Sequence, residues 1–168
     1  PGVTLGYDIR KKGEDADINA SLLIPSLIYS LSGGRAGKLG FEFNSSLEAQ
    51  NNFTRFMLPS VTMRLFSPEA QGNALFVSIK GDVFAGKQTR GWIKIDRLSF
   101  NKEPLESMVP GSLKAKISAI PLKKPVESTL LVQFAMSPDK AEVNADLGIN
   151  IPDYDLPDLA LRASICQD

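Results

Sequence analysis

The sequence contains no histidine and only one cysteine, Cys166, among its 168 residues. The absence of histidine excludes serine–histidine and cysteine–histidine catalytic pairs, and also histidine metal ligands. A single cysteine excludes an intrachain disulfide and a thiolate metal cage, so we expect Cys166 to be a small core or interface residue. No catalytic constellation remains, and the sequence therefore predicts a protein that is not an enzyme and holds no cofactor or metal.

The chain also lacks a net charge and a long hydrophobic run. It has 19 Lys+Arg against 19 Asp+Glu, which argues against strong general attraction to nucleic acid or to an anionic membrane. Its longest apolar run, 22–31, is interrupted by Pro25 and Ser26 and falls short of the roughly 18 residues of a membrane span. We expect no membrane partner. With 43% hydrophobic and 23% charged residues, the composition suits one globular domain over residues 1–168.

Alternation of apolar and polar residues is the strongest pattern present. In 141–151 every odd-numbered residue is apolar and every even-numbered residue is polar or glycine. A period of two is typical of a β-strand with one buried face. The same alternation occurs at 39–43, 61–65, 75–79, 93–95, 113–119, 130–136 and 159–165, and more weakly at 3–9. The sequence therefore predicts about nine strands.

Short turn segments separate these strands, for example Ser67-Pro68-Glu69 and Ser137-Pro138-Asp139. Such short connections favour antiparallel pairing. We therefore predict an all-β fold: an antiparallel β-sandwich, specifically a jelly roll of about eight to nine strands. Alternation alone leaves an immunoglobulin-like sandwich open as well.

Two stretches depart from simple alternation. The apolar residues of 24–31 are spaced i, i+3, i+4, i+7, and Pro25 suits a first helical position, which predicts a short helix near 25–31. The amide-rich stretch 44–52 predicts an exposed loop or a single helical turn.

Clusters of charge offer few candidate sites. Asp153, Asp155 and Asp158 could ligate calcium, but their spacing is not that of an EF-hand, and a solvated acidic turn is the favoured interpretation. The dense basic clusters are Arg10-Lys11-Lys12 and Lys123-Lys124. Either cluster could contact phosphate, although solvated loops are the simpler interpretation.

One segment carries a resemblance to a known family. An apolar stretch is followed by Gly33-Gly34-Arg35 and then by an alternating strand that begins Gly37-Lys38-Leu39-Gly40-Phe41. This arrangement resembles the early strands of picorna-like capsid jelly rolls, especially in the comovirus, nepovirus and cheravirus group of plant viruses. The following strand, 60–66, runs into Ser67-Pro68, as such strands often run into a proline-bearing loop.

The resemblance implies a structural capsid subunit. Such a subunit would assemble with sister jelly-roll proteins into an icosahedral shell around single-stranded RNA, in the virion and, during assembly, in the host cytoplasm. Its partners would be the other capsid proteins and the RNA genome, with Arg10, Lys11 and Lys12 as candidates to face the RNA. A chain that opens at Pro1 fits a product of polyprotein cleavage.

Some apolar residues exceed what one buried face requires, and these are candidates for the subunit interface. They are Leu22, Leu23, Ile24, Met57 and Leu58.

Three alternatives remain open. A secreted or periplasmic β-sandwich binding module would fit the glycosylation sequons at Asn19, Asn44 and Asn52. A β-barrel or lipid-transfer domain would hold an apolar ligand inside. An enzyme without histidine would need a carboxylate pair such as Asp82 and Asp96.

Overall fold

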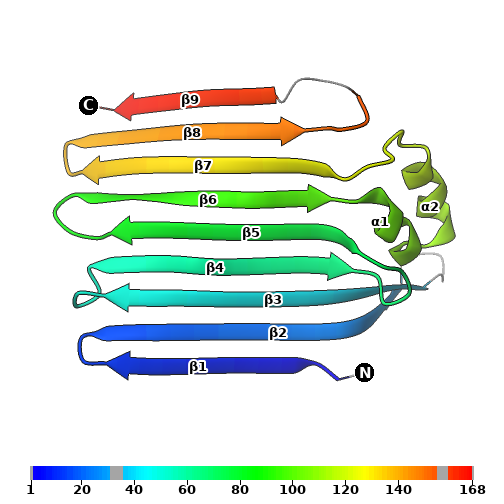
Figure 1. Cartoon of the computed structure of the whole chain (residues 1–168), viewed down its shortest axis with the longest axis horizontal. Helices are drawn as coiled ribbons and strands as arrows, with labels where there is room; N and C mark the ends of the chain where they lie inside the picture. Colours follow the sequence, from blue (N-terminus) through cyan, green and yellow to red (C-terminus); the bar gives the residue numbers. More distant parts are fainter. Residues whose placement is uncertain (1, 31–35, 155–158, 168) are drawn as a thin grey trace.

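All strands in the computed structural model lie in one antiparallel sheet and follow one another in the order of the sequence (Figure 1). The structure describes residues 2–30, 36–154 and 159–167. The strands are β1 (Thr4–Lys12), β2 (Asp15–Ser30), β3 (Ala36–Gln50), β4 (Arg55–Phe66), β5 (Asn73–Phe84), β6 (Thr89–Phe100), β7 (Val126–Ser137), β8 (Lys140–Asn150) and β9 (Leu159–Gln167). Two short helices, α1 (Lys102–Met108) and α2 (Gly111–Ser118), connect β6 to β7.

The strand register places most of the apolar residues of the strands on the same side of the sheet. Cross-strand partners share a face, because side chains alternate between faces along each strand. One row of consecutive partners crosses the whole sheet: Tyr7, Ala20, Ser45, Val61, Ile79, Ile95, Leu130, Leu147 and Leu161. We call the side that carries this row the apolar face, and the opposite side the polar face.

β-Bulges preserve this division where the sequence parity changes. In β4 the apolar face carries odd-numbered residues such as Val61, whereas before Pro59 it carries the even-numbered Leu58. The register shift between Leu58 and Val61 adds the extra residue that brings both side chains to one face. The bulges therefore keep the apolar face continuous.

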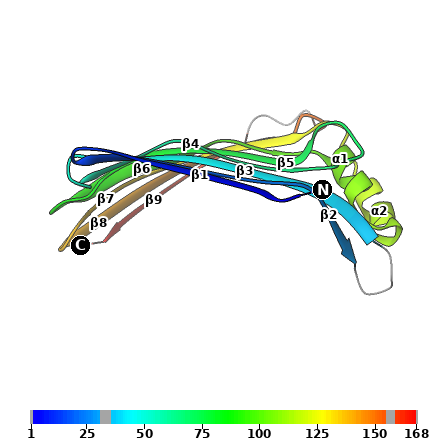
Figure 2. The same cartoon turned by 90° about the horizontal axis from the view of Figure 1, so that it is seen from below.

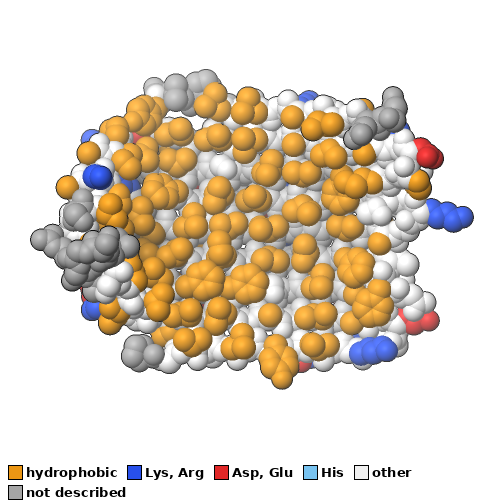
Figure 3. Space-filling model, turned by 180° about the vertical axis from the view of Figure 1, so that it is seen from behind, with side chains coloured by type: hydrophobic (Ala, Val, Ile, Leu, Met, Phe, Trp, Pro, Cys, Tyr) orange, Lys and Arg blue, Asp and Glu red, His pale blue; other side chains and the backbone are white. Residues whose placement is uncertain are grey.

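The sheet is arched, and its apolar face lies on the concave side. Figure 2 shows the arch edge-on, with both helices below one end of it. Figure 3 shows the side turned away from the viewer in Figure 1, where hydrophobic side chains spread over nearly the whole sheet. The two views agree that the helices and the apolar side chains occupy the same side.

A second layer does not cover this face in the part of the chain that the structure describes. The buried apolar residues there, glycines aside, are Ala16, Ala49, Ala74, Pro104, Met108 and Pro110, with no large aliphatic or aromatic side chain among the strands. The all-β class is confirmed. The observed architecture, however, is one open meander, and not the two packed sheets expected of a jelly roll.

The helix expected near 25–31 is wrong, because β2 continues to Ser30. A bulge between Ile24 and Leu27 explains the error. The extra residue shifts the apolar positions from even to odd, so a bulged strand produces the i, i+3 spacing of a helix. Residue 31 lies outside the described residues.

The strand expected at 113–119 is wrong as well, since α2 covers most of it. Leu113 and Ile117 fit the i, i+4 spacing of a helix as well as the alternation of a strand. The residues between them, two lysines and one alanine, favour a helix. The loop expected at 44–52 is also wrong up to Gln50, where β3 ends. The turn that follows holds Asn51, Asn52 and Phe53 at positive φ.

Ion pairs link neighbouring strands across the polar face. Arg55 in β4 donates two hydrogen bonds to Asp82 in β5, at 3.0 and 2.6 Å. Arg64 in β4 pairs in the same way with Glu42 in β3. Arginines also cover aromatic rings on this face, with Arg55 4.8 Å from the ring centre of Phe84. These contacts shield the apolar groups that the polar face does carry.

Replacement of Asp82 should change how stability depends on pH. Hydrogen bonds from Arg55 hold the pKa of Asp82 below its ordinary value. A lowered folded-state pKa gives stability that is complete above the unfolded-state pKa of about 3.9 and is lost as the pH falls through the folded-state pKa. Asp82→Asn should therefore unfold more easily than wild type at pH 7, and the two free energies of unfolding should converge below about pH 4.

Urea denaturation between pH 7 and pH 2.5 measures this convergence. Asp139→Asn, in the exposed turn between β7 and β8, is the control and should follow wild type throughout. A constant difference between wild type and Asp82→Asn over that pH range would contradict the prediction.

Gly91 should not tolerate even a methyl group. A Cβ there would overlap the carbonyl oxygen of Asp82 and lie 2.9 Å from Cα of Val83, and both are backbone atoms of the adjacent strand. We expect Gly91→Ala to lower the free energy of unfolding by about 1–3 kcal/mol, as measured by urea denaturation. Gly86→Ala is the matched control, because its Cβ would meet nothing closer than 3.7 Å. Equal midpoints for the two variants would refute the explanation.

Candidate apolar ligand-binding face

The apolar face remains accessible to solvent from one edge of the sheet to the other. Exposure is greatest on the edge strands, where Tyr7 of β1 is 80% exposed and Leu161 of β9 is 63% exposed. It persists in the middle of the sheet, where Ile93 of β6 is 39% exposed. A contiguous apolar surface of this extent marks a site of interaction with another molecule.

The total accessible area leads to the same conclusion. The chain exposes 11050 Å². A compact monomer of this mass would expose about 8,100 Å², so the excess is about 3,000 Å². A standard protein–protein interface covers about 800 Å² on each partner, so the excess exceeds what one such contact would cover.

The helical connection stands at one end of the concave side. α1 contacts β3, β4 and β5, and the Tyr29 hydroxyl at the end of β2 donates a hydrogen bond of 2.8 Å to the carbonyl oxygen of Met108. Asn101 caps α1 by accepting a hydrogen bond from the backbone N–H of Glu103. The helices therefore limit the apolar face at this end.

The composition of the face suits a flexible hydrocarbon. Its side chains are aliphatic and aromatic, with small polar interruptions such as Ser45 and Ser128. Lys11 lies at its margin, opposite Ala16. Such a surface offers dispersion contacts and exclusion of water, without charges that would require a polar partner.

The expected interface residues divide between the two faces. Leu22 and Ile24 share the apolar face with their β3 partners Phe43 and Phe41. Leu58 belongs to the same face, opposite Gly81 of β5. Leu23 and Met57 lie on the polar face: Leu23 is opposite Glu42, and Met57 is opposite Asp82.

The basic residues expected to face RNA lie at the end of β1. Arg10 pairs with Asp8 at 2.7 Å, and Lys12 pairs with Asp17 at 3.6 Å. Lys11 points to the opposite face from its two neighbours. These three side chains therefore do not form one cationic surface.

The carboxylate candidates are not brought together. Asp82 of β5 pairs with Trp92 of β6, and Trp92 is four residues along β6 from Asp96. Hydrogen bonds from Lys94 and Lys80, each at 2.9 Å, hold the pKa of Asp96 below its ordinary value. Each carboxylate pairs with its own cations: Asp82 with Arg55, and Asp96 with Lys80 and Lys94.

The acidic turn does not form a metal site in the described part of the chain. Asp153 accepts hydrogen bonds from the backbone N–H groups of Lys124 and Lys123, which hold its pKa below the ordinary value. Asp155 and Asp158 lie outside the described residues. No group of three or more His, Cys, Asp or Glu residues that could hold a metal occurs among the residues described.

The polar face carries several shallow hollows. One, of about 430 Å³, lies over β1 to β4 and is lined by Gly6, Asn19, Ser21, Asn44 and Ser46, among others. Two of the three sequon asparagines therefore lie on this face, and the third, Asn52, lies in an exposed turn. Cys166 is exposed on β9.

The sequence pattern did not predict that the apolar face is open and could bind a ligand. The edge stretches 3–9 and 159–165 do alternate in apolar residues, which indicates an apolar side on each of them. Alternation shows that one side is apolar, but it does not show whether another layer covers that side.

Among the described residues, neither helix is both long and apolar enough to cross a membrane. Comparisons with protein-family models, with curated proteins and with solved structures found no match.

Proposed function

We propose that this chain binds long apolar chains, such as the acyl chains of a lipid, along its concave apolar face. The observation that carries the proposal is the row of largely apolar side chains, interrupted by Ser45, which crosses all nine strands and has no covering layer among the residues that the structure describes. The apolar-ligand alternative of the sequence analysis therefore has the stronger support, although the ligand would lie on an open sheet and not inside a closed barrel.

The hydrophobic effect supplies the driving force. Each methylene group that leaves water contributes about 0.8 kcal/mol. An extended chain of a dozen methylenes would contribute on the order of 10 kcal/mol before the costs of immobilisation. A face that spans nine strands has room for more than one such chain.

The curvature favours a flexible ligand over a second copy of the sheet. Two concave faces that meet leave a gap between them, and α1 and α2 project from the same side of each sheet (Figure 2). Hydrocarbon chains adapt to a concave surface and fill it. This difference in shape is what supports a lipid ligand rather than a face-to-face dimer.

A charge at the centre of the apolar face should weaken this binding. Ile93 is 39% exposed, so an aspartate there can remain hydrated in the free protein, whereas a bound acyl chain would remove its water. We expect Ile93→Asp to weaken the binding of a fluorescent fatty acid by about tenfold or more. Gln133→Asp is the matched control, because this exposed residue lies on the polar face of the neighbouring strand.

Fluorescence titration gives the affinities, and native mass spectrometry of the purified protein reports any lipid that is carried along. Circular dichroism checks that both variants remain folded. Wild-type protein that shows no saturable fatty-acid binding, or equal loss of affinity in both variants, would overturn the proposal.

The capsid subunit remains a hypothesis, and one observation favours it. Both edge strands, β1 and β9, have one edge that pairs with no other strand among the described residues and that could pair with another subunit. Microscopy and sedimentation of material from the natural source test it: icosahedral shells that contain this chain would establish it, and a monomer alone would refute it. Glycans on Asn44 or Asn52 would instead favour the secreted binding module.

A further inference from the structure

A cluster of lysines lies on the helical connection, although the chain as a whole has no net charge. The segment 111–125, here named the basic segment, contains Lys114, Lys116, Lys123 and Lys124 and no acidic residue. All four lysines are exposed. The balance of charge over the whole chain therefore conceals a local excess of four positive charges.

Exposed apolar side chains accompany these lysines. Leu113 is 37% exposed and Ile120 is 40% exposed, with Ile117 partly exposed between them. Leu113 and Ile117, at i and i+4 of α2, form a short apolar stripe with Lys114 and Lys116 on its two flanks, and Ile120 follows just after the helix ends at Ser118. In the described part of the chain α2 contacts α1 and no strand, and Leu113 and Ile120 remain exposed.

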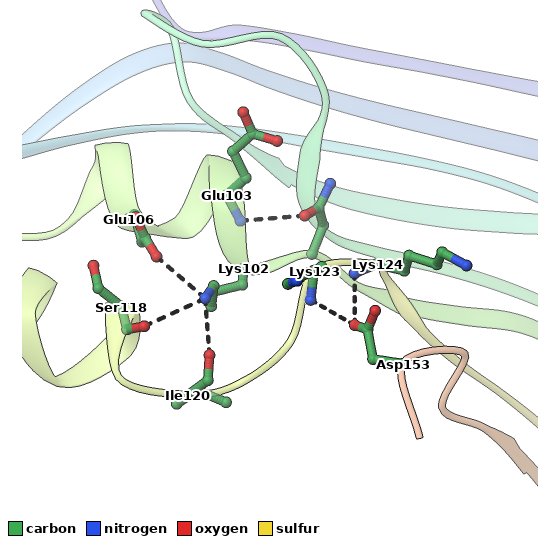
Figure 4. Close-up of polar contacts among 9 residues, drawn as sticks. Lys102, Glu103, Glu106, Ser118, Ile120, Lys123, Lys124 and Asp153 are labelled. Carbon is green, nitrogen blue, oxygen red and sulfur yellow. Dashed lines mark hydrogen bonds and ion pairs between the residues drawn. The ribbon is translucent and has the colours of Figure 1, made fainter. Parts of the chain in front are cut away.

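Two side chains hold the basic segment in place from opposite sides (Figure 4). The Lys102 ammonium of α1, 19% exposed, donates hydrogen bonds to the carbonyl oxygens of Ile120 at 2.8 Å and Ser118 at 3.4 Å, which satisfies the C-terminal end of α2. Asp153 accepts hydrogen bonds from the backbone N–H groups of Lys123 and Lys124. The side chains of Lys123 and Lys124 take no part in these hydrogen bonds.

The basic segment also lies at the end of the concave side. Figures 1 and 2 place α2 beyond the end of the sheet and below the arch, next to the apolar face. A surface that touched α2 would thus adjoin the site where we propose that acyl chains bind.

We infer that the basic segment docks on the surface of an anionic phospholipid bilayer. An apolar stripe flanked by lysines is the pattern that lies in a bilayer interface, with the aliphatic groups inserted and the ammonium groups at the headgroups. The absence of acidic residues makes the charge of the segment complementary to anionic lipid. Docking itself does not depend on the proposed function. Its use to the protein does rest on that function, because docking here would bring the apolar face next to a source of lipid.

Vesicle co-sedimentation with the full chain tests this docking. Wild-type protein should bind vesicles of phosphatidylcholine with phosphatidylglycerol, should bind vesicles of phosphatidylcholine alone far less, and should be released by salt. Each lysine near an anionic surface strengthens binding about fivefold, so Lys114→Gln with Lys116→Gln should weaken the partition by about 30-fold.

The matched control removes two exposed lysines from the other end of the sheet: Lys87 in the β5–β6 turn and Lys140 at the start of β8. Lys87→Gln with Lys140→Gln should bind anionic vesicles like wild type. Equal weakening in both double variants, or wild-type binding that does not depend on anionic lipid, would overturn the inference. Binding to single-stranded RNA through the same lysines, with none to vesicles, would overturn it too.

Fatty-acid titration of the same preparations separates the two proposals. The Lys114→Gln, Lys116→Gln variant should bind the fluorescent fatty acid like wild type, since neither lysine lies on the apolar face. Wild-type protein that docks on anionic vesicles but binds no fatty acid would refute the proposed function and leave the docking inference standing. The converse result would refute the docking alone.

Discussion

The alternation of apolar and polar residues, held in register through nine strands, is the constraint on which the rest of the structure depends. Each strand shares a face with its neighbours only because the paired residues match, as Val61 matches Ile79 and Ile79 matches Ile95. A slip of one residue in one strand would move its aliphatic side chains among charged ones. The bulges in β2, β4 and β6 correct the register where the sequence departs from strict alternation.

The two faces of the sheet differ in how many of their side chains find contacts within the chain itself. On the polar face, arginines pair with carboxylates on adjacent strands and cover aromatic rings, as Arg64 does with Glu42 and Phe66. On the apolar face, α1 covers one end over β3, β4 and β5, and over the rest of the described sheet no second layer lies on the apolar side chains. This difference between the two faces supports the function proposed here.

Local pattern predicted the strands well, because the burial of one face produces a period of two wherever a strand is regular. The prediction failed at β2, where the bulge after Ile24 imitates helical spacing, and at α2, where Leu113 and Ile117 fit both periods. The apolar face could not be recognised as a site, because whether a second sheet covers it depends on contacts between distant residues. The interface candidates Leu22 and Leu58 lie on that face. Their neighbours Leu23 and Met57 lie on the opposite one, because adjacent residues of a strand face opposite sides of the sheet.

The meander topology also determines how stability is distributed along the sheet. Among the strands, contacts occur only between sequence neighbours, from β1 with β2 to β8 with β9. Cohesion is therefore a sum over adjacent hairpins, as in repeat proteins, and not the property of one central core. Such a sheet can nucleate at any hairpin, grow outward by local steps and fray from either edge while its centre stays intact.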